Sequence, residues 1–283
     1  MATIEYMPAR LTPKETEELR QAVACLEGAS FAQRLTDAVG RPVGMLSRAM
    51  PQSARRVIAH VSETALRGAL KLALRTLDLN ASAKPANRAH RLAAAASGAV
   101  GGALGLAALP FELPISTTIL LRSIAEIARE EGEDLSAPEA AFACVEVFAL
   151  GGQGSGESAF ESGYFAVRAA LAKSVSDSAR FVAAQGVAAL PAPVVARLIS
   201  QIAARFGIVV SEKVAAQAAP ILGAIGGAAV NAAFTDHFQT LARGHFIVRR
   251  LERQHGASVV AFEYQRLQGE RSGEYAESRR AAS

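Results

Sequence analysis

The residues best suited to chemistry are polar side chains at the edges of two long uncharged stretches. Glu112 directly follows the stretch Leu92–Phe111, and Asn231 lies near the end of the stretch Val214–Thr235. A carboxylate in apolar surroundings needs a cation or a hydrogen-bond donor as its partner. We therefore expect Glu112 to pair with Arg122 or with another arginine. The amide of Asn231 is expected to fix the register of its helix.

A binding or acid–base pocket is the alternative interpretation of these side chains. Carboxylates and an imidazole can move protons, while an amide and a guanidinium can bind polar groups, provided that all of them reach one substrate. The candidate pocket consists of Glu112, Arg122, Glu126, Asn231, Asp236 and His237.

No metal site and no cofactor is predicted. The five histidines are widely spaced, and the sequence has no HExxH motif. His237 and His245 are eight residues apart, near one face of a continuous helix, but a metal site there would need a further carboxylate such as Glu112.

The glycine-rich segment Gly151–Ser158 superficially resembles a phosphate-binding loop. It lacks the Lys-Ser/Thr pair that holds phosphate and magnesium, and no strand precedes it. It does not fit the GxSxG nucleophile elbow either. We interpret it as a flexible loop between helices and predict no serine nucleophile, which favours a non-enzymatic role.

Small residues four apart characterise both uncharged stretches. A GxxxG pair lets another helix approach closely, and this contact should offset the roughly 1 kcal/mol that each Gly costs a helix. Both stretches are long enough to cross a bilayer, but Ala and Gly contribute little to insertion. A buried hairpin and reversible membrane insertion therefore both remain open. The expected helix-packing positions are Gly98, Gly101, Gly102, Gly105, Gly223, Gly226 and Gly227.

The elements that carry these residues are predicted to be helices. Strand-type alternation is nearly absent, and Thr12 followed by Pro13 and Glu15 is typical of a helix start. The segment Leu109–Pro114 should break the helix, with Ser116 or Thr117 capping the next one. The expected fold is an all-α, multi-helix bundle with the two Gly/Ala-rich helices packed centrally.

Length and composition suit one large domain or two small ones. The chain has 283 residues, of which 51% are hydrophobic and 20% charged, so disorder and a disulfide scaffold are excluded. We expect an N-terminal helical arm over residues 1–54, a helical domain over 55–265 and a disordered polar tail over 266–283.

The N-terminal third is basic. Residues 1–91 contain 14 Lys or Arg against 8 Asp or Glu, and a basic amphipathic helix is predicted over Ser53–Leu77. This helix could meet an anionic membrane or be a solvated face; no nucleic-acid motif accompanies it. No signal peptide is evident, so we expect a cytoplasmic protein. The candidate membrane contacts are Arg55, Arg56, Arg67, Lys71 and Arg75.

Several ordered blocks resemble the EcsC family of bacterial proteins over roughly residues 55–265. The blocks are Leu109–Pro114 with Thr117-Thr118, Leu121–Ala128 and Gly132–Leu135; Tyr164–Arg168; Ala219–Gly227 with Asn231 and Thr235; and Phe246–Gly256 with Tyr264. The segment 151–156 departs from the family pattern, since a more charged loop is expected there. The family is named for a protein encoded beside the Ecs ABC transporter, and the resemblance implies no established enzymatic activity.

Together, these observations favour a non-enzymatic helical protein that associates reversibly with the inner face of the cell membrane. The basic helices would contact anionic lipid, and the resemblance implies an ABC transporter or another membrane protein as a partner. The alternative is an enzyme or a small-molecule or lipid-binding protein that uses the polar pocket around Glu112. A purely structural scaffold is a third hypothesis.

Overall fold

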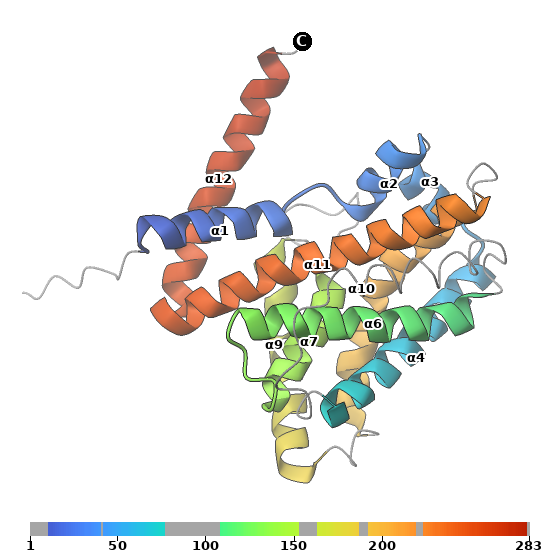
Figure 1. Cartoon of the computed structure of the whole chain (residues 1–283), viewed down its shortest axis with the longest axis horizontal. Coiled ribbons are helices and arrows are strands. Elements are labelled where there is room, and N and C mark those ends of the chain that lie inside the picture. The colour runs from blue at the N-terminus through green and yellow to red at the C-terminus, as the bar shows by residue number, and fades with distance from the viewer. Residues whose placement is uncertain are drawn as a thin grey trace, which may run out of the picture. The chain divides into compact units, whose positions relative to one another are not determined.

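A computed structural model describes residues 11–40, 42–76, 108–152, 163–186, 192–218 and 223–281. Across these ranges the regular elements are helices and none is a strand, which confirms the predicted all-α fold (Figure 1). The helices are α1 (Pro13–Leu26), α2 (Phe31–Val39), α3 (Val43–Arg48), α4 (Gln52–Thr76), α6 (Leu109–Glu130), α7 (Pro138–Leu150), α9 (Tyr164–Gln185), α10 (Pro193–Gln217), α11 (Gly223–His255) and α12 (Ala257–Ala281).

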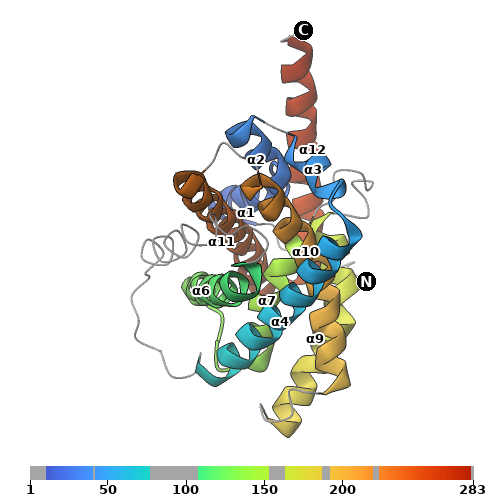
Figure 2. The same ribbon diagram turned by 90° about the vertical axis from the view of Figure 1, so that its right-hand side faces the viewer.

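The helices form two compact units, here called the large unit (residues 29–242) and the small unit (residues 1–28 with 243–283). Their boundaries differ from the predicted divisions at residues 54 and 265. In the large unit α10 is central, because it contacts α2, α3, α4, α7 and α9, while α4 packs along α6. Figure 2 shows α6 nearly end-on with α4 crossing beside it.

The large unit has an aromatic core where α7, α10 and α11 meet. The rings of Phe148, Phe206, Phe234 and Phe238 contact one another, with centroids 5.0 to 6.1 Å apart. α7 is buried along nearly its whole length, from Ala140 to Leu150. Apart from the buried Glu146, apolar residues surround this helix on all sides.

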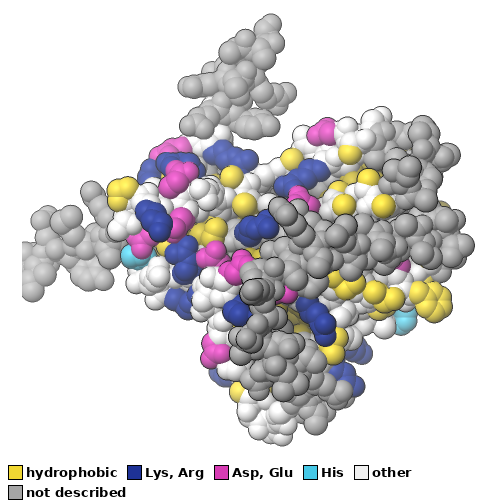
Figure 3. All heavy atoms as spheres, viewed as in Figure 1, with side chains coloured by type: hydrophobic (Ala, Val, Ile, Leu, Met, Phe, Trp, Pro, Cys, Tyr) yellow, Lys and Arg dark blue, Asp and Glu magenta, His cyan; other side chains and the backbone are white. Residues whose placement is uncertain are grey.

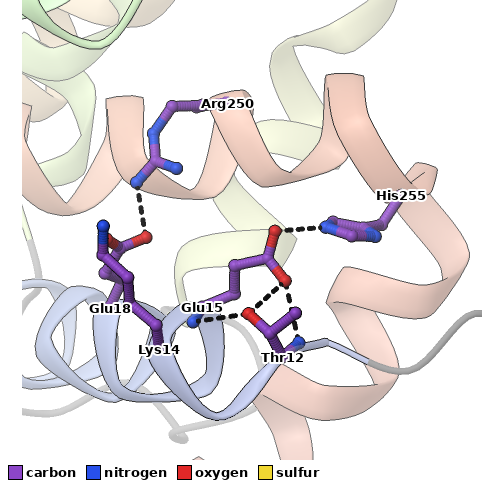
Figure 4. A network of polar contacts seen from close by, with 6 residues as sticks. All are labelled: Thr12, Lys14, Glu15, Glu18, Arg250 and His255. Carbon is purple, nitrogen blue, oxygen red and sulfur yellow. Dashed lines mark hydrogen bonds and ion pairs between the residues drawn. The ribbon is translucent and has the colours of Figure 1, made fainter.

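The small unit is held by α1, whose predicted start is confirmed. The hydroxyl of Thr12 accepts from the backbone N–H of Glu15, and the Glu15 carboxylate accepts from the Thr12 N–H at 2.8 Å, which makes a capping box. That carboxylate also contacts His255 at 2.8 Å, and Arg250 pairs with Glu18 at 2.9 Å (Figure 4). The Thr12 backbone N–H, the Thr12 hydroxyl and His255 lower the pKa of Glu15 to about 2.

The basic helix is confirmed as α4, but α6 differs from the prediction. α6 begins at Leu109 and contains both Pro110 and Pro114, so Ser116 and Thr117 lie inside it rather than capping a new helix. Pro110 lies in the first turn, where the backbone N–H has no helical partner in any case. Pro114 leaves only the carbonyl of Pro110 without its helical N–H donor, and Pro110 lies at the very start of the helix.

Two further predictions are corrected. The stretch Val214–Thr235 is not one helix, because α10 ends at Gln217 and α11 begins at Gly223. The residues between Arg266 and Ala281, expected to be a disordered tail, continue α12 as a helix.

Membrane-spanning length is reached by one helix in the described ranges. α10 is long and apolar enough to cross a bilayer, and 44% of its most apolar window is buried inside the protein. The core helix of a globular protein has the same length and composition. Residues 92–107 lie outside the described ranges, and with them Gly98, Gly101, Gly102 and Gly105.

The start of the predicted glycine loop is fixed by tight packing. A Cβ on Gly152 would lie 2.5 Å from the carbonyl oxygen of Arg205, and one on Gly151 would lie 2.9 Å from Nε2 of His237. Backbone cannot yield easily, so Gly152 allows the end of α7 to touch α10. The rest of the loop, residues 153–158, lies outside the described ranges.

We predict that Gly152→Ala lowers the free energy of unfolding by about 1–3 kcal/mol, since the added methyl group overpacks a backbone contact. The matched control is Gly68→Ala on α4, where a Cβ meets no atom within 4 Å. That change should stabilise the protein by up to about 1 kcal/mol. Urea unfolding of both variants measures the difference, and equal effects would contradict the tight packing.

Candidate functional site

The candidate site is a buried ion pair between the start of α6 and the end of α10. Nζ of Lys213 donates to Oε1 of Glu112 at 2.6 Å, and the two side chains are 0% and 5% exposed. Glu112 lies in the first turn of α6, where the helix dipole favours a negative charge. The predicted buried pair of Glu112 is thus present, but its partner is a lysine rather than an arginine.

α11 completes the surroundings of this pair. The ammonium group of Lys213 lies 4.8 Å from the ring centroid of Phe234, a cation–π contact. Asn231 and Thr235 are buried on neighbouring turns, and the Thr235 hydroxyl donates to the Asn231 carbonyl at 3.0 Å. Three helices therefore meet around a single buried cation.

Burial and the ion pair act on Lys213 in opposite directions. Burial lowers its pKa, and the charge and hydrogen bond of Glu112 partly restore it. Removing one partner would leave the other as an uncompensated buried charge, which is far more costly than removing both. The pair therefore ties α6 to α10 rather than exposing a reactive group.

A second link joins α6 to α11 further along. Nε2 of Gln239 donates to Oγ of Ser123 at 2.6 Å, and both side chains are fully buried. Polar contacts between buried side chains are specific in geometry, so the two links fix the position of α6 against α10 and α11.

Glu212, next to Lys213, points toward a different neighbour, because successive helical residues are about 100° apart. It is buried, its carboxylate accepts from the backbone N–H of Ala32 in the first turn of α2, and the charge of Arg48 acts on it. Burial raises the pKa of Glu212 to about 7, against these two weaker influences.

His237 is buried between aromatic rings rather than aimed at a common site. Its ring lies 5.1 Å from that of Phe31 and 5.2 Å from that of Phe238, with the backbone of Gly151 alongside. Burial lowers its pKa to about 3, and the charge of Arg34 adds to this effect. The imidazole is therefore neutral at physiological pH, as a core side chain.

The predicted pocket is not assembled as a single site. Arg122 is exposed, and it lies ten residues, or about 15 Å, along α6 from the buried Glu112. Glu126 and Asp236 are half-buried, and Asn231 and His237 point in different directions from α11. Of the predicted residues, Glu112 belongs to the buried ion pair, and Asn231 lies one turn before Phe234 on α11.

Lys213 was missed by the sequence reasoning, although a signal exists. Glu212 and Lys213 interrupt a long apolar stretch of α10, between Val210 and Val214. Two adjacent charges in an otherwise apolar helix indicate buried partners on two sides.

Among the glycines predicted to pack α11, Gly227 is buried. The surroundings of Gly223 and Gly226 lie outside what the structure describes.

The guanidinium of Arg168 stacks over the rings of Tyr164 and Phe165, at 5.3 and 5.8 Å from the ring centroids. No group of three or more His, Cys, Asp or Glu side chains with metal-binding geometry occurs in the described ranges.

A model of the EcsC protein family matches residues 5–251 of the chain. The match begins well before residue 55, so α1, α2 and α3 lie within it. No curated protein and no solved structure matches the chain.

We predict that Lys213→Met and Glu112→Leu, made singly, each destabilise the protein by about 3–5 kcal/mol, because each leaves a charge buried without its partner. The double variant removes both charges and should recover most of that loss. Urea unfolding of the four proteins gives the coupling energy directly. A double variant that loses the sum of the single effects would show that the pair carries no coupling.

A pH prediction concerns Glu212. The pKa of Glu212 in the folded chain is about 7, against an ordinary value of 4.5. Between these two pH values the folded chain therefore binds more protons than the unfolded chain does. The wild type should therefore lose stability as pH rises from about 4.5 to about 7, by roughly 3 kcal/mol at most. Glu212→Gln keeps an oxygen acceptor for the Ala32 N–H and cannot ionise.

The stability of Glu212→Gln relative to wild type should thus be higher at pH 8 than at pH 5, as measured by urea unfolding at both values. Glu139→Gln, at an exposed position on α7, is the control. Parallel pH profiles of Glu212→Gln and wild type would refute the prediction.

Proposed function

The chain belongs to the EcsC protein family, and on that premise we propose that it is a non-enzymatic protein that associates reversibly with the inner face of the cell membrane. The start of α6 enters the headgroup region of the bilayer, and arginines at the start of α4 contact anionic lipid.

The observation that carries this proposal is the exposed apolar start of α6. Phe111 is 77% exposed and Ile115 is 55% exposed, and they lie one turn apart on the same face. Figure 3 shows hydrophobic side chains on the surface at the end of the large unit where α6 begins. Moving such side chains out of water contributes about 1.5–3 kcal/mol each, which suits a reversible association.

Basic residues on α4 support membrane contact by the same surface. α4 packs along α6, and Arg55 and Arg56 are exposed at its start. Each basic residue near an anionic membrane adds about 1 kcal/mol. Arg67 is paired with Glu63 at 2.7 Å, so it supports lipid contact less strongly than Arg55 and Arg56 do. The side chain of Arg75 lies outside the residues whose side chains the structure describes.

The buried ion pair supports a non-enzymatic role. Glu112, a member of the predicted pocket, is paired with Lys213, and both side chains are buried. They hold the start of α6 in place while its opposite face stays exposed. The ABC transporter remains a proposed partner that rests on the family resemblance.

Flotation with lipid vesicles tests the proposal. Wild-type protein should float with vesicles of phosphatidylcholine and phosphatidylglycerol, and less with phosphatidylcholine alone. Phe111→Ser with Ile115→Ser should reduce the bound fraction about tenfold or more, since two apolar anchors are lost. Phe262→Ser, at a 68% exposed phenylalanine on α12, is the matched control and should bind as wild type does. Wild-type protein that stays with the soluble fraction would contradict the proposal.

A further inference from the structure

We propose that α3 is a second membrane anchor, so that the large unit docks through the end on which α3 and the starts of α4 and α6 lie (Figure 2). This docking end is defined by α3, the first three turns of α4 and the first three turns of α6. The inference rests on the proposed function and adds an orientation to it.

The first ground is that α3 exposes apolar side chains on a well-packed base. Met45 is 69% exposed and Leu46 is 42% exposed, on a helix of six residues. Val43 of the same helix is fully buried, and α3 contacts both α2 and α10. Val57 on α4 adds a further exposed apolar side chain.

The second ground is that α3 is fixed at both of its ends. The backbone N–H of Val43 donates to the Thr36 hydroxyl of α2 at 3.1 Å. At the other end, the Arg55 guanidinium of α4 donates to the carbonyl oxygens of Arg48 and Met50. Met45 and Leu46 thus lie on a helix that is already held in place. Little conformational freedom would therefore be lost when they insert into a bilayer.

The third ground is charge complementarity with an anionic surface. The sequence between Asp37 and Glu63 contains four arginines and no acidic residue. On the docking end, the described charged side chains that are exposed are all arginines, namely Arg48, Arg55 and Arg56. The single acid, Glu112, is buried against Lys213.

Exposed apolar side chains next to these three arginines match an anionic bilayer. Figure 2 looks onto this end, with α3, α4 and α6 toward the viewer.

The geometry also limits which basic residues take part. α4 runs obliquely away from the docking end, and Arg67 and Lys71 lie about 16 and 22 Å along its axis from Arg56. Charges much more than about 8 Å from the lipid surface are largely screened at physiological salt. End-on docking therefore uses Arg48, Arg55 and Arg56 but not Arg67 and Lys71.

Flotation of four variants with phosphatidylcholine–phosphatidylglycerol vesicles at physiological salt tests the orientation. Met45→Ser with Leu46→Ser should lower the bound fraction about tenfold, because two apolar side chains are lost. Arg48→Gln with Arg56→Gln should lower it severalfold. Arg67→Gln with Lys71→Gln and the single change Phe262→Ser are the controls and should stay within twofold of wild type. Circular dichroism confirms that each variant is folded.

The outcomes separate the orientation from the proposed function. If the Met45/Leu46 variant binds as wild type does while the Phe111/Ile115 variant does not, α3 is not an anchor, but membrane association stands. If Arg67→Gln with Lys71→Gln abolishes binding, α4 lies flat on the lipid and end-on docking is wrong. If the wild type does not float with these vesicles, both proposals fail.

Discussion

The fold of the large unit depends on one costly interaction, the buried ion pair between Glu112 and Lys213. Two charges removed from water must compensate each other closely, and any shift of α6 along α10 would separate them. The cation–π contact with Phe234 adds α11 to the same cluster. The pair thus specifies how three helices meet, whatever its net contribution to stability.

This constraint has a consequence for the surface. Phe111 and Ile115 point outward from the start of α6, while Glu112 points inward. Leu109 and Leu113 are buried beside Glu112 on the inward face. The ion pair holds the inward face, so the outward face remains available to a lipid surface.

Much of the fold could be predicted from the sequence because helix signals are local. Thr12, Pro13 and Glu15 mark the start of α1 as predicted, and the basic helix predicted over Ser53–Leu77 is present as α4. Pro114 misled the prediction, since a proline near a helix start is tolerated and its position in the helix depends on where the helix begins.

The candidate site could be predicted only in part, because it depends on contacts distant in sequence. The chain itself showed that Glu112 needs a cation, yet Lys213 is 101 residues away and nothing local selects it over the arginines. The predicted pocket failed for the same reason, since proximity along α6 does not bring Arg122 to Glu112. The docking end combines α3, α4 and α6, and only the folded structure shows which of their residues are exposed.

The central claim is that the ion pair holds the start of α6, and hydrogen exchange measures this most directly. Amide exchange in the first half of α6 is compared with that in α9 for the wild type, Lys213→Met and the Glu112→Leu/Lys213→Met double variant. The account predicts that α6 exchanges at least about tenfold faster relative to α9 in Lys213→Met and returns toward the wild-type rate in the double variant. Exchange that rises equally in α6 and α9, or that stays fast in the double variant, would contradict it.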